Sequence, residues 1–376
     1  MTQNAALFDA IRFGEIQAQN RIVMAPLTRS RATAQENMPT ALNADYYAQR
    51  ASAGLIVSEA TQISQEGQGY AWTPGIFSDD HVKGWTLVNE AVHAKGGKIV
   101  CQLWHVGAIS HNVFHGGAAP VSSSVWTPKG QAFVGDLLPD GPLAPHPQAR
   151  ALETDEIPRL LADYRHACEQ AKRAGFDGVE VHGANGYLID QFLRSSVNRR
   201  EDAYGGSVEN RIRLLIEAVE TAVGVWGAGR VGVRLSPTGG PGGSYDDDPE
   251  TLYTAAAAAL SGRGLAYLHV IRPNSHTGPE SGRAEQIGNL VDRMRAAFDG
   301  VFIANGEFSP GEAADWVASG RADAVAFGRL FIANPDLPAR IAQGGPYNEP
   351  DQATFYGGGA KGYTDYPTLE QAKEQA

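Results

Sequence analysis

His182, Asn185 and Tyr187 lie in one short segment and combine side chains able to act on a carbonyl compound. The segment follows an apolar run, Gly178–Val181, typical of a buried strand, and precedes Leu188–Leu193, where a helix is expected to begin. His182 and Asn185 can hold a carbonyl oxygen and polarise a conjugated C=C bond, and Tyr187 can deliver a proton. A lone histidine is as often a structural residue, but the two polar neighbours favour the chemical interpretation.

These side chains must be positioned by a larger repeat of strands and helices. Eight short apolar runs alternate with helical patterns, which predicts an α/β protein of the (β/α)8 TIM-barrel class. The expected strands are Arg21–Leu27, Leu55–Ile63, Lys98–Trp104, Asp177–Ala184, Val231–Pro237, Leu265–Ile271, Val301–Gly306 and Ala322–Gly328. The expected helices are Asn43–Ala53, Asp80–Lys95, Thr154–Ala174, Ser207–Val225, Pro249–Gly262, Ala284–Phe298 and Pro310–Ser319.

Two segments depart from the plain barrel. The stretch from about 105 to 153, after the third strand, is rich in Gly, Pro, Ser and His, and we expect an active-site lid. Phe8–Asn20 is predicted to form an N-terminal hairpin that plugs the barrel bottom. The aromatic and glycine-rich segment Phe355–Gly359 is expected to fold back. Residues 1–376 should therefore form a single barrel domain.

Composition excludes several classes of protein. The formal charge is 31 − 42 = −11, which argues against nucleic acid or an acidic membrane as partner. No apolar stretch is long enough to cross a membrane. Met1–Ala10 lacks the features of a signal peptide, and we expect a cytoplasmic enzyme. Cys101 and Cys168 are interpreted as reduced, buried packing residues.

In a barrel, chemistry is expected at the carboxyl ends of the strands. Gly306, Gly328 and Arg329 follow the seventh and eighth strands, where a phosphate is commonly bound. The alternative interpretation is that the two glycines form tight turns and that Arg329 is a solvated surface charge. Arg234 ends the fifth strand and can stabilise negative charge on a cofactor. The alternative role of Arg234 is a salt bridge to a nearby carboxylate.

Two other patterns do not predict sites. Gly227–Gly232 matches G-x-G-x-x-G but precedes a strand, the wrong context for dinucleotide binding. His105, His111 and His115 lack a carboxylate at suitable spacing, so we expect no metal.

Several longer motifs resemble the Old Yellow Enzyme family of FMN-dependent ene-reductases. The similarity runs from about Leu7 to Pro367. It is specific through the combination of NRIVMAPLTRSRA, QLWHVG, VHGANGYLIDQFL, YGGSVENRIR, AFGRLFIANPDL and FYGGGAKGYTDYP. One departure is Ala108, where the family usually has arginine, which suggests a lost surface or lid contact. Two further departures from the family are the glycine-rich stretches 239–248 and 272–282.

The resemblance implies roles for individual residues. Tyr187 matches the proton donor, and His182 and Asn185 match the pair that binds the carbonyl oxygen. Positions matching cofactor contacts are Ala25, Pro26, Leu27, Thr28, Ala60, Gln102, His182, Arg234, Asn305, Gly306, Gly328 and Arg329. Positions matching substrate contacts are Tyr70, Trp104, His182, Asn185, Tyr187 and Tyr356.

The family also implies an activity. Non-covalently bound FMN would be reduced by NADPH or NADH and would pass hydride from N5 to the β carbon of an α,β-unsaturated carbonyl compound. Nitroalkenes and nitrate esters are further substrates of the family, and we expect this protein to be a monomer or homodimer. Two alternatives stay open: a barrel lyase or isomerase acting on a phosphorylated substrate with Glu59 as base, and a flavin-binding protein without turnover.

Overall fold

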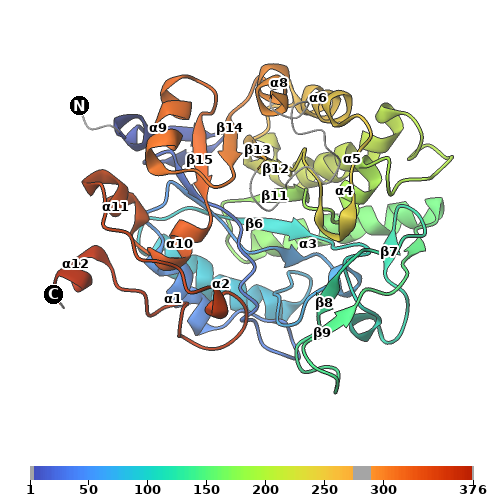
Figure 1. Ribbon diagram of the computed structural model, residues 1–376, viewed down its shortest axis with the longest axis horizontal. Coiled ribbons are helices and arrows are strands. Elements are labelled where there is room, and N and C mark those ends of the chain that lie inside the picture. The colour runs from blue at the N-terminus through green and yellow to red at the C-terminus, as the bar shows by residue number, and fades with distance from the viewer. Residues whose placement is uncertain (1–3, 274–288, 375–376) are drawn as a thin grey trace.

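Eight parallel strands close into a barrel in the computed structural model, which describes residues 4–273 and 289–374 (Figure 1). Each strand pairs with its neighbours and β15 pairs with β3, which completes the ring. The predicted (β/α)8 class is confirmed. The strands are β3 (Ile22–Met24), β4 (Leu55–Val57), β6 (Ile99–Trp104), β11 (Gly178–Gly183), β12 (Val231–Leu235), β13 (Tyr267–Ile271), β14 (Phe302–Asn305) and β15 (Ala324–Phe327).

Helices surround the barrel because the outward residues of every strand are apolar and need cover. The main ones are α1 (Ala41–Gln49), α2 (Asp79–His93), α3 (Ile157–Arg173), α5 (Val208–Trp226), α6 (Pro249–Leu260), α8 (Leu290–Ala297) and α9 (Pro310–Ala318). Shorter ones are α4 (Leu188–Leu193), α10 (Arg329–Ala333), α11 (Leu337–Gln343) and α12 (Leu369–Glu374). Of the helix predicted at Ala284–Phe298, residues 284–288 lie outside the described part of the chain.

The barrel interior is apolar at the bottom and polar at the top. An N-terminal hairpin, β1 (Ile11–Phe13) and β2 (Ile16–Ala18), packs against the lower interior residues and confirms the predicted plug. Its Phe13 ring meets Tyr267 edge-on, with centroids 5.9 Å apart. The upper interior carries polar side chains, all buried. They are Gln102, Glu180, His182, Arg234, His269 and Asn305.

The second predicted strand, Leu55–Ile63, is wrong as a continuous element. It breaks after β4 and resumes as β5 (Thr61–Gln62). The hydroxyls of Ser58 and Thr61 both donate to the carbonyl oxygen of Glu59, at 2.9 and 2.7 Å. These local bonds compete with the strand ladder and turn the chain at its mouth end.

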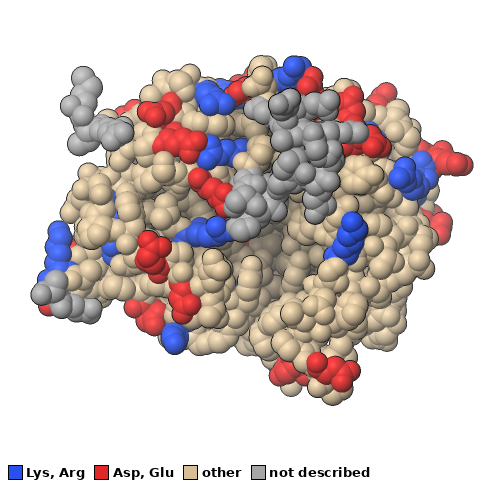
Figure 2. All heavy atoms as spheres, viewed as in Figure 1, with Lys and Arg blue, Asp and Glu red and all other residues tan. Residues whose placement is uncertain are grey.

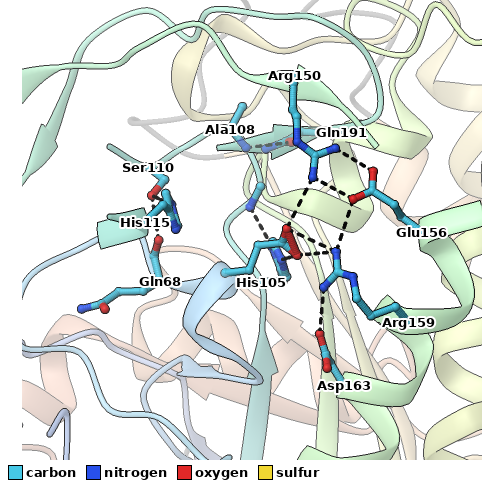
Figure 3. Close-up of polar contacts among 12 residues, drawn as sticks. Gln68, His105, Ala108, Ser110, His115, Arg150, Glu156, Arg159, Asp163 and Gln191 are labelled. Carbon is cyan, nitrogen blue, oxygen red and sulfur yellow. Dashed lines mark hydrogen bonds and ion pairs between the residues drawn. The ribbon is translucent and has the colours of Figure 1, made fainter. Parts of the chain in front are cut away.

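The insertion after β6 contributes four short strands. β8 (Gln131–Phe133) and β9 (Leu143–Pro145) form an antiparallel hairpin, and β7 (Val121–Ser122) pairs in parallel with β10 (Arg150–Ala151). Figure 3 shows how its far end is anchored: Arg150 of β10 contacts Glu156, the residue that precedes α3. Ala108, in this insertion, is fully buried, and its N–H donates to Gln191 Oε1 at 3.1 Å.

Within residues 4–273 and 289–374, no helix is both long and apolar enough to cross a bilayer. Cys101 and Cys168 are buried free thiols, as predicted. Gly227 follows α5 with φ +77° and leads into β12, so the glycine-rich match is a helix end.

Candidate active site

His182 lies next to the last residue of β11, and its ring carries a hydrogen-bond donor. The N–H of Ala184 donates to His182 Nδ1 at 3.3 Å, so the proton of the neutral ring lies on Nε2. Burial, followed by the positive charge of Arg234, holds the pKa of His182 well below its usual value. His182 is therefore a neutral donor suited to a carbonyl oxygen.

Asn185 sits in a left-handed turn that the surrounding protein holds in place. Its φ is +58°, and its N–H donates to Ser236 Oγ at 2.7 Å. The next N–H, of Gly186, donates to Asp190 Oδ2 at 2.7 Å. Asp190 is in turn held by Arg194 Nε at 2.8 Å and by Tyr253 OH at 2.7 Å. This buried network fixes the turn that carries Asn185 and Tyr187.

Tyr187 stands among aromatic rings. Its hydroxyl lies 3.2 Å from that of Tyr70, and its ring meets Trp104 and His182 edge-on, with centroids 5.0 and 5.2 Å apart. Burial, followed by neighbouring Tyr70, raises the pKa of Tyr187 well above its usual value. Burial raises the pKa of Tyr70 to about 12. Both phenols stay protonated at neutral pH, so Tyr187 can donate a proton.

A cavity of about 780 Å³ opens beside these rings. Its volume suits a cofactor together with a small substrate. Figure 2 shows that the surface around the hollow on this face is largely uncharged, with a few charged side chains at its edge. The lining residues are Pro26, Leu27, Thr28, Ser30, Tyr70, Phe133, Leu143, Tyr187, Arg329, Ile332, Gln352, Phe355 and Tyr356.

Several predicted residues lie deeper than this lining. Ala60 and Trp104 share an apolar cluster with Tyr70 and Tyr187, whereas Ala25 belongs to the barrel interior. Phe133 and Leu143 from the β8–β9 hairpin were not predicted. They carry no polar signal in the sequence, and only the folding of the insertion brings them to the cavity.

Arg234 is held by an amide instead of a carboxylate. Its Nη2 donates to Asn305 Oδ1 at 2.9 Å, and Asn305 Nδ2 donates to the carbonyl of Ala326 at 2.8 Å. No carboxylate among the described residues lies within salt-bridge distance of Arg234, and its Nε is buried without a partner. Asn305 thus positions Arg234.

The predicted phosphate positions gather at the ends of β14 and β15. Gly306 has φ +125°, a conformation that other residues rarely adopt, and Gly328 precedes α10. Arg329 lines the cavity with its side chain 45% exposed. Its Nη1 also lies 3.3 Å from Glu307 Oε1, an ion pair that competes with a bound anion.

The C-terminal segment reaches the cavity through a clamp of buried arginines. Arg29 donates from Nε to the carbonyl of Phe355 and from Nη2 to that of Gly362, both at 2.9 Å. Arg31 Nη2 donates to the carbonyl of Thr354 at 2.9 Å. This clamp folds the segment back, as predicted, and places Tyr356 at the cavity. The clamp itself was missed, because backbone acceptors leave no pattern in the sequence.

Among the described residues, no group of three or more His, Cys, Asp or Glu side chains is placed to hold a metal ion. The ring of His115 instead contacts the hydroxyl of Ser110 at 2.8 Å, as Figure 3 shows.

Comparison with known proteins identifies the family. The profile of the NADH:flavin oxidoreductase / NADH oxidase family matches residues 6–348. The chain belongs to this family. It is 42% identical to the flavin oxidoreductase hxnT of Emericella nidulans, covering 96% of this chain and 97% of that protein. It is 41% identical to 12-oxophytodienoate reductase 2 of Arabidopsis thaliana, covering 98% and 97%.

Solved structures of the family agree with this fold. Morphinone reductase superposes with a TM-score of 0.92 at 48% identity, covering 97% of each chain. The Old Yellow Enzyme homologue from Zymomonas mobilis gives a TM-score of 0.91 at 46% identity, covering 96% of this chain and 99% of that one. The resemblance to Old Yellow Enzymes is confirmed, and the protein is an NAD(P)H-dependent flavin oxidoreductase.

Proposed function

We propose that the protein is an FMN-dependent ene-reductase that reduces the C=C bond of α,β-unsaturated carbonyl compounds with NADPH or NADH. When bound, FMN would accept hydride from the nicotinamide and pass it to the β carbon of the alkene. The observation that carries the proposal is the contact between two rings of opposite use: His182, neutral with its proton on Nε2, meets edge-on the ring of Tyr187, whose protonated hydroxyl belongs to a residue lining the cavity.

The side chains at the barrel mouth fit a flavin. A flavin ring system needs several hydrogen-bond partners around its polar edge, and buried polar atoms need partners in turn. Arg234 Nε is buried without one, and Gln102 Oε1 accepts no bond from the described residues. Pro26, Leu27 and Thr28 line the cavity and, with Ala60, would contact the ring system. Gly306, Gly328 and Arg329 would hold the phosphate.

His182 and Asn185 would grip the carbonyl oxygen of the substrate. Hydride addition at the β carbon leaves negative charge on that oxygen, and two fixed donors stabilise this charge more than they stabilise the neutral ground state. Because both donors are neutral, their grip does not depend on pH near neutrality. The turn held by Asp190 keeps their geometry before the substrate arrives.

Tyr187 would protonate the α carbon. Its hydroxyl is held by Tyr70 at 3.2 Å, and Trp104 packs edge-on against its ring. Tyr70 stacks on Trp104 with ring planes 14° apart and limits the cavity on this side. Tyr356 would contact the substrate from the other side, and nitroalkenes or nitrate esters offer the same donors an equivalent oxygen. One cavity serving both reductant and alkene predicts ping-pong kinetics.

The insertion would act as the lid of a single-domain enzyme. Phe133 and Leu143 of the β8–β9 hairpin line the cavity and exclude water from it. A lyase using Glu59 as base has less support, because Glu59 is fully buried beside Tyr47 and the backbone of Arg29 and does not line the cavity. A cytoplasmic monomer or homodimer remains our expectation.

An absorbance experiment tests the proposal. Purified protein should show flavin bands that bleach with NADPH or NADH under anaerobic conditions and return when cyclohexenone is added. Bands that bleach but do not return with any electron-poor alkene would refute ene reduction while leaving flavin reduction intact. Colourless protein that cannot be reconstituted with FMN would refute the cofactor.

A further inference from the structure

Glu180 is a carboxylate enclosed within the barrel, on the same strand as His182. It lies on β11 two residues before His182, with its side chain fully buried. Its backbone is directly opposite Gln102 of β6 in the strand register. An ionised carboxylate in such a place needs partners for both oxygens.

Each carboxylate oxygen of Glu180 has one donor. Gln102 Nε2 lies 2.7 Å from Oε1, and His269 Nδ1 lies 2.9 Å from Oε2. Burial opposes the charge, but His269, Arg234 and Gln102 outweigh it and hold the pKa of Glu180 below its usual value. An ionised carboxylate only accepts hydrogen bonds, so the NH₂ end of Gln102 must face it.

The other end of the amide is thereby fixed. Because Gln102 Nε2 donates to Glu180, the amide oxygen Oε1 is the atom that faces the barrel mouth. No described residue donates to this oxygen. Gln102 is only 1% exposed as a whole residue. A bound group with an N–H would supply the missing donor.

We propose that Glu180 is a positioning residue for the cofactor, which holds the Gln102 amide so that Oε1 accepts from the imide N–H of the flavin. The inference rests on the proposed FMN site. Without the carboxylate, the amide can rotate by 180° and present its NH₂ to the flavin N–H, which leaves donors facing each other. Glu180 therefore acts through Gln102 and touches no substrate.

Glu180→Gln tests this with little change in volume. We expect it to weaken FMN binding to apoprotein at least tenfold, measured by quenching of flavin fluorescence, and to shift the ¹H–¹⁵N signal of the imide N–H of ¹⁵N-labelled FMN. His269→Gln is the matched control, because its amide can still donate to Glu180; its FMN affinity should stay near that of wild type. Equal losses in both variants would show general damage to the barrel and would overturn the inference.

A Gln102→Leu protein distinguishes an effect of Glu180 through Gln102 from a direct effect of the carboxylate charge on FMN. If Glu180 acts through Gln102, Glu180→Gln should not weaken FMN binding further in a Gln102→Leu protein. Additive losses would show that the carboxylate acts by its own charge and would overturn the inference. A Glu180→Gln variant that binds FMN as tightly as wild type does, with an unchanged imide N–H signal, would also overturn the inference. In that case the proposed function would still hold, because the wild-type protein binds FMN. Wild-type protein that binds no FMN would instead remove the proposed cofactor itself.

Discussion

Replacing Glu59 by glutamine should stabilise the folded protein at pH 8 far more than at pH 5. Glu59 is fully buried, and burial raises its pKa from 4.5 to about 7 even though the N–H of Arg29 donates to its Oε2 at 3.2 Å. Tyr47 OH lies 3.4 Å from Oε1. A glutamine can keep the bond from Arg29 N–H through its amide oxygen, while its NH₂ would donate to Tyr47 OH in place of accepting from it.

The magnitude follows from the raised pKa. Below pH 4.5 the carboxyl is protonated in both folded and unfolded chains and has no effect on the pH dependence. Between 4.5 and 7 only the unfolded chain ionises, so stability is lost as pH rises. The shift of 7 − 4.5 = 2.5 pKa units corresponds to about 3 kcal/mol at pH 8, of which less than about 1 kcal/mol is already lost at pH 5.

Urea unfolding of wild type and Glu59→Gln between pH 5 and pH 8 provides the assay. The free-energy difference between the two proteins should grow by about 2 to 3 kcal/mol across this range in favour of the variant. Glu66→Gln serves as the control: its carboxylate is partly buried, but His105 and Arg159 overcome that burial and lower its pKa to about 2, so its contribution to stability changes below pH 4.5 and should stay nearly constant between pH 5 and pH 8. Parallel stability curves for Glu59→Gln and wild type would refute the reasoning.

Three further perturbations test the site, and Asp336→Ala is the control for the first of them. Asp190→Ala should lower the unfolding free energy by about 3–5 kcal/mol, because it removes the carboxylate partner of the buried Arg194. It should also weaken the binding of phenol, a probe whose oxygen would take the place of the substrate carbonyl oxygen. Asp336→Ala breaks another Asp–Arg pair four residues apart and should reduce stability without changing phenol affinity. Tyr187→Phe should slow enone reduction at least tenfold in rapid-mixing experiments while flavin reduction by NADPH stays unchanged; equal slowing of both half-reactions would contradict its role as proton donor. His182→Ala should weaken phenol binding to the oxidised enzyme, and wild-type phenol affinity would exclude its role in holding the oxygen.

Local signals made much of the molecule predictable from sequence. Alternating apolar runs and helical patterns reflect which face of each element is buried, so they gave the barrel class and the position of every core strand. The short segment around His182 combined donor side chains at a strand end. The helix predicted from Pro310 begins there as α9, and the Ser309 hydroxyl accepts from Glu312 N–H.

Contacts between distant segments were decided only by the tertiary structure. One local feature also escapes an apolar pattern: the strand predicted at Leu55–Ile63 is interrupted where the hydroxyls of Ser58 and Thr61 donate to the carbonyl of Glu59. The clamp formed by Arg29 and Arg31 holds backbone oxygens more than 300 residues away, and any residue type supplies such an acceptor.

The sequence by itself determined the barrel and the type of chemistry at its mouth, because periodicity and residue type are local properties. The tertiary structure decided how those groups are oriented. It set the tautomer of His182 through a backbone N–H two residues away, and the direction of the Gln102 amide through the buried carboxylate of Glu180. Orientation depends on which donors and acceptors meet in space, and only folding brings residues of β6, β11 and β13 together inside one barrel.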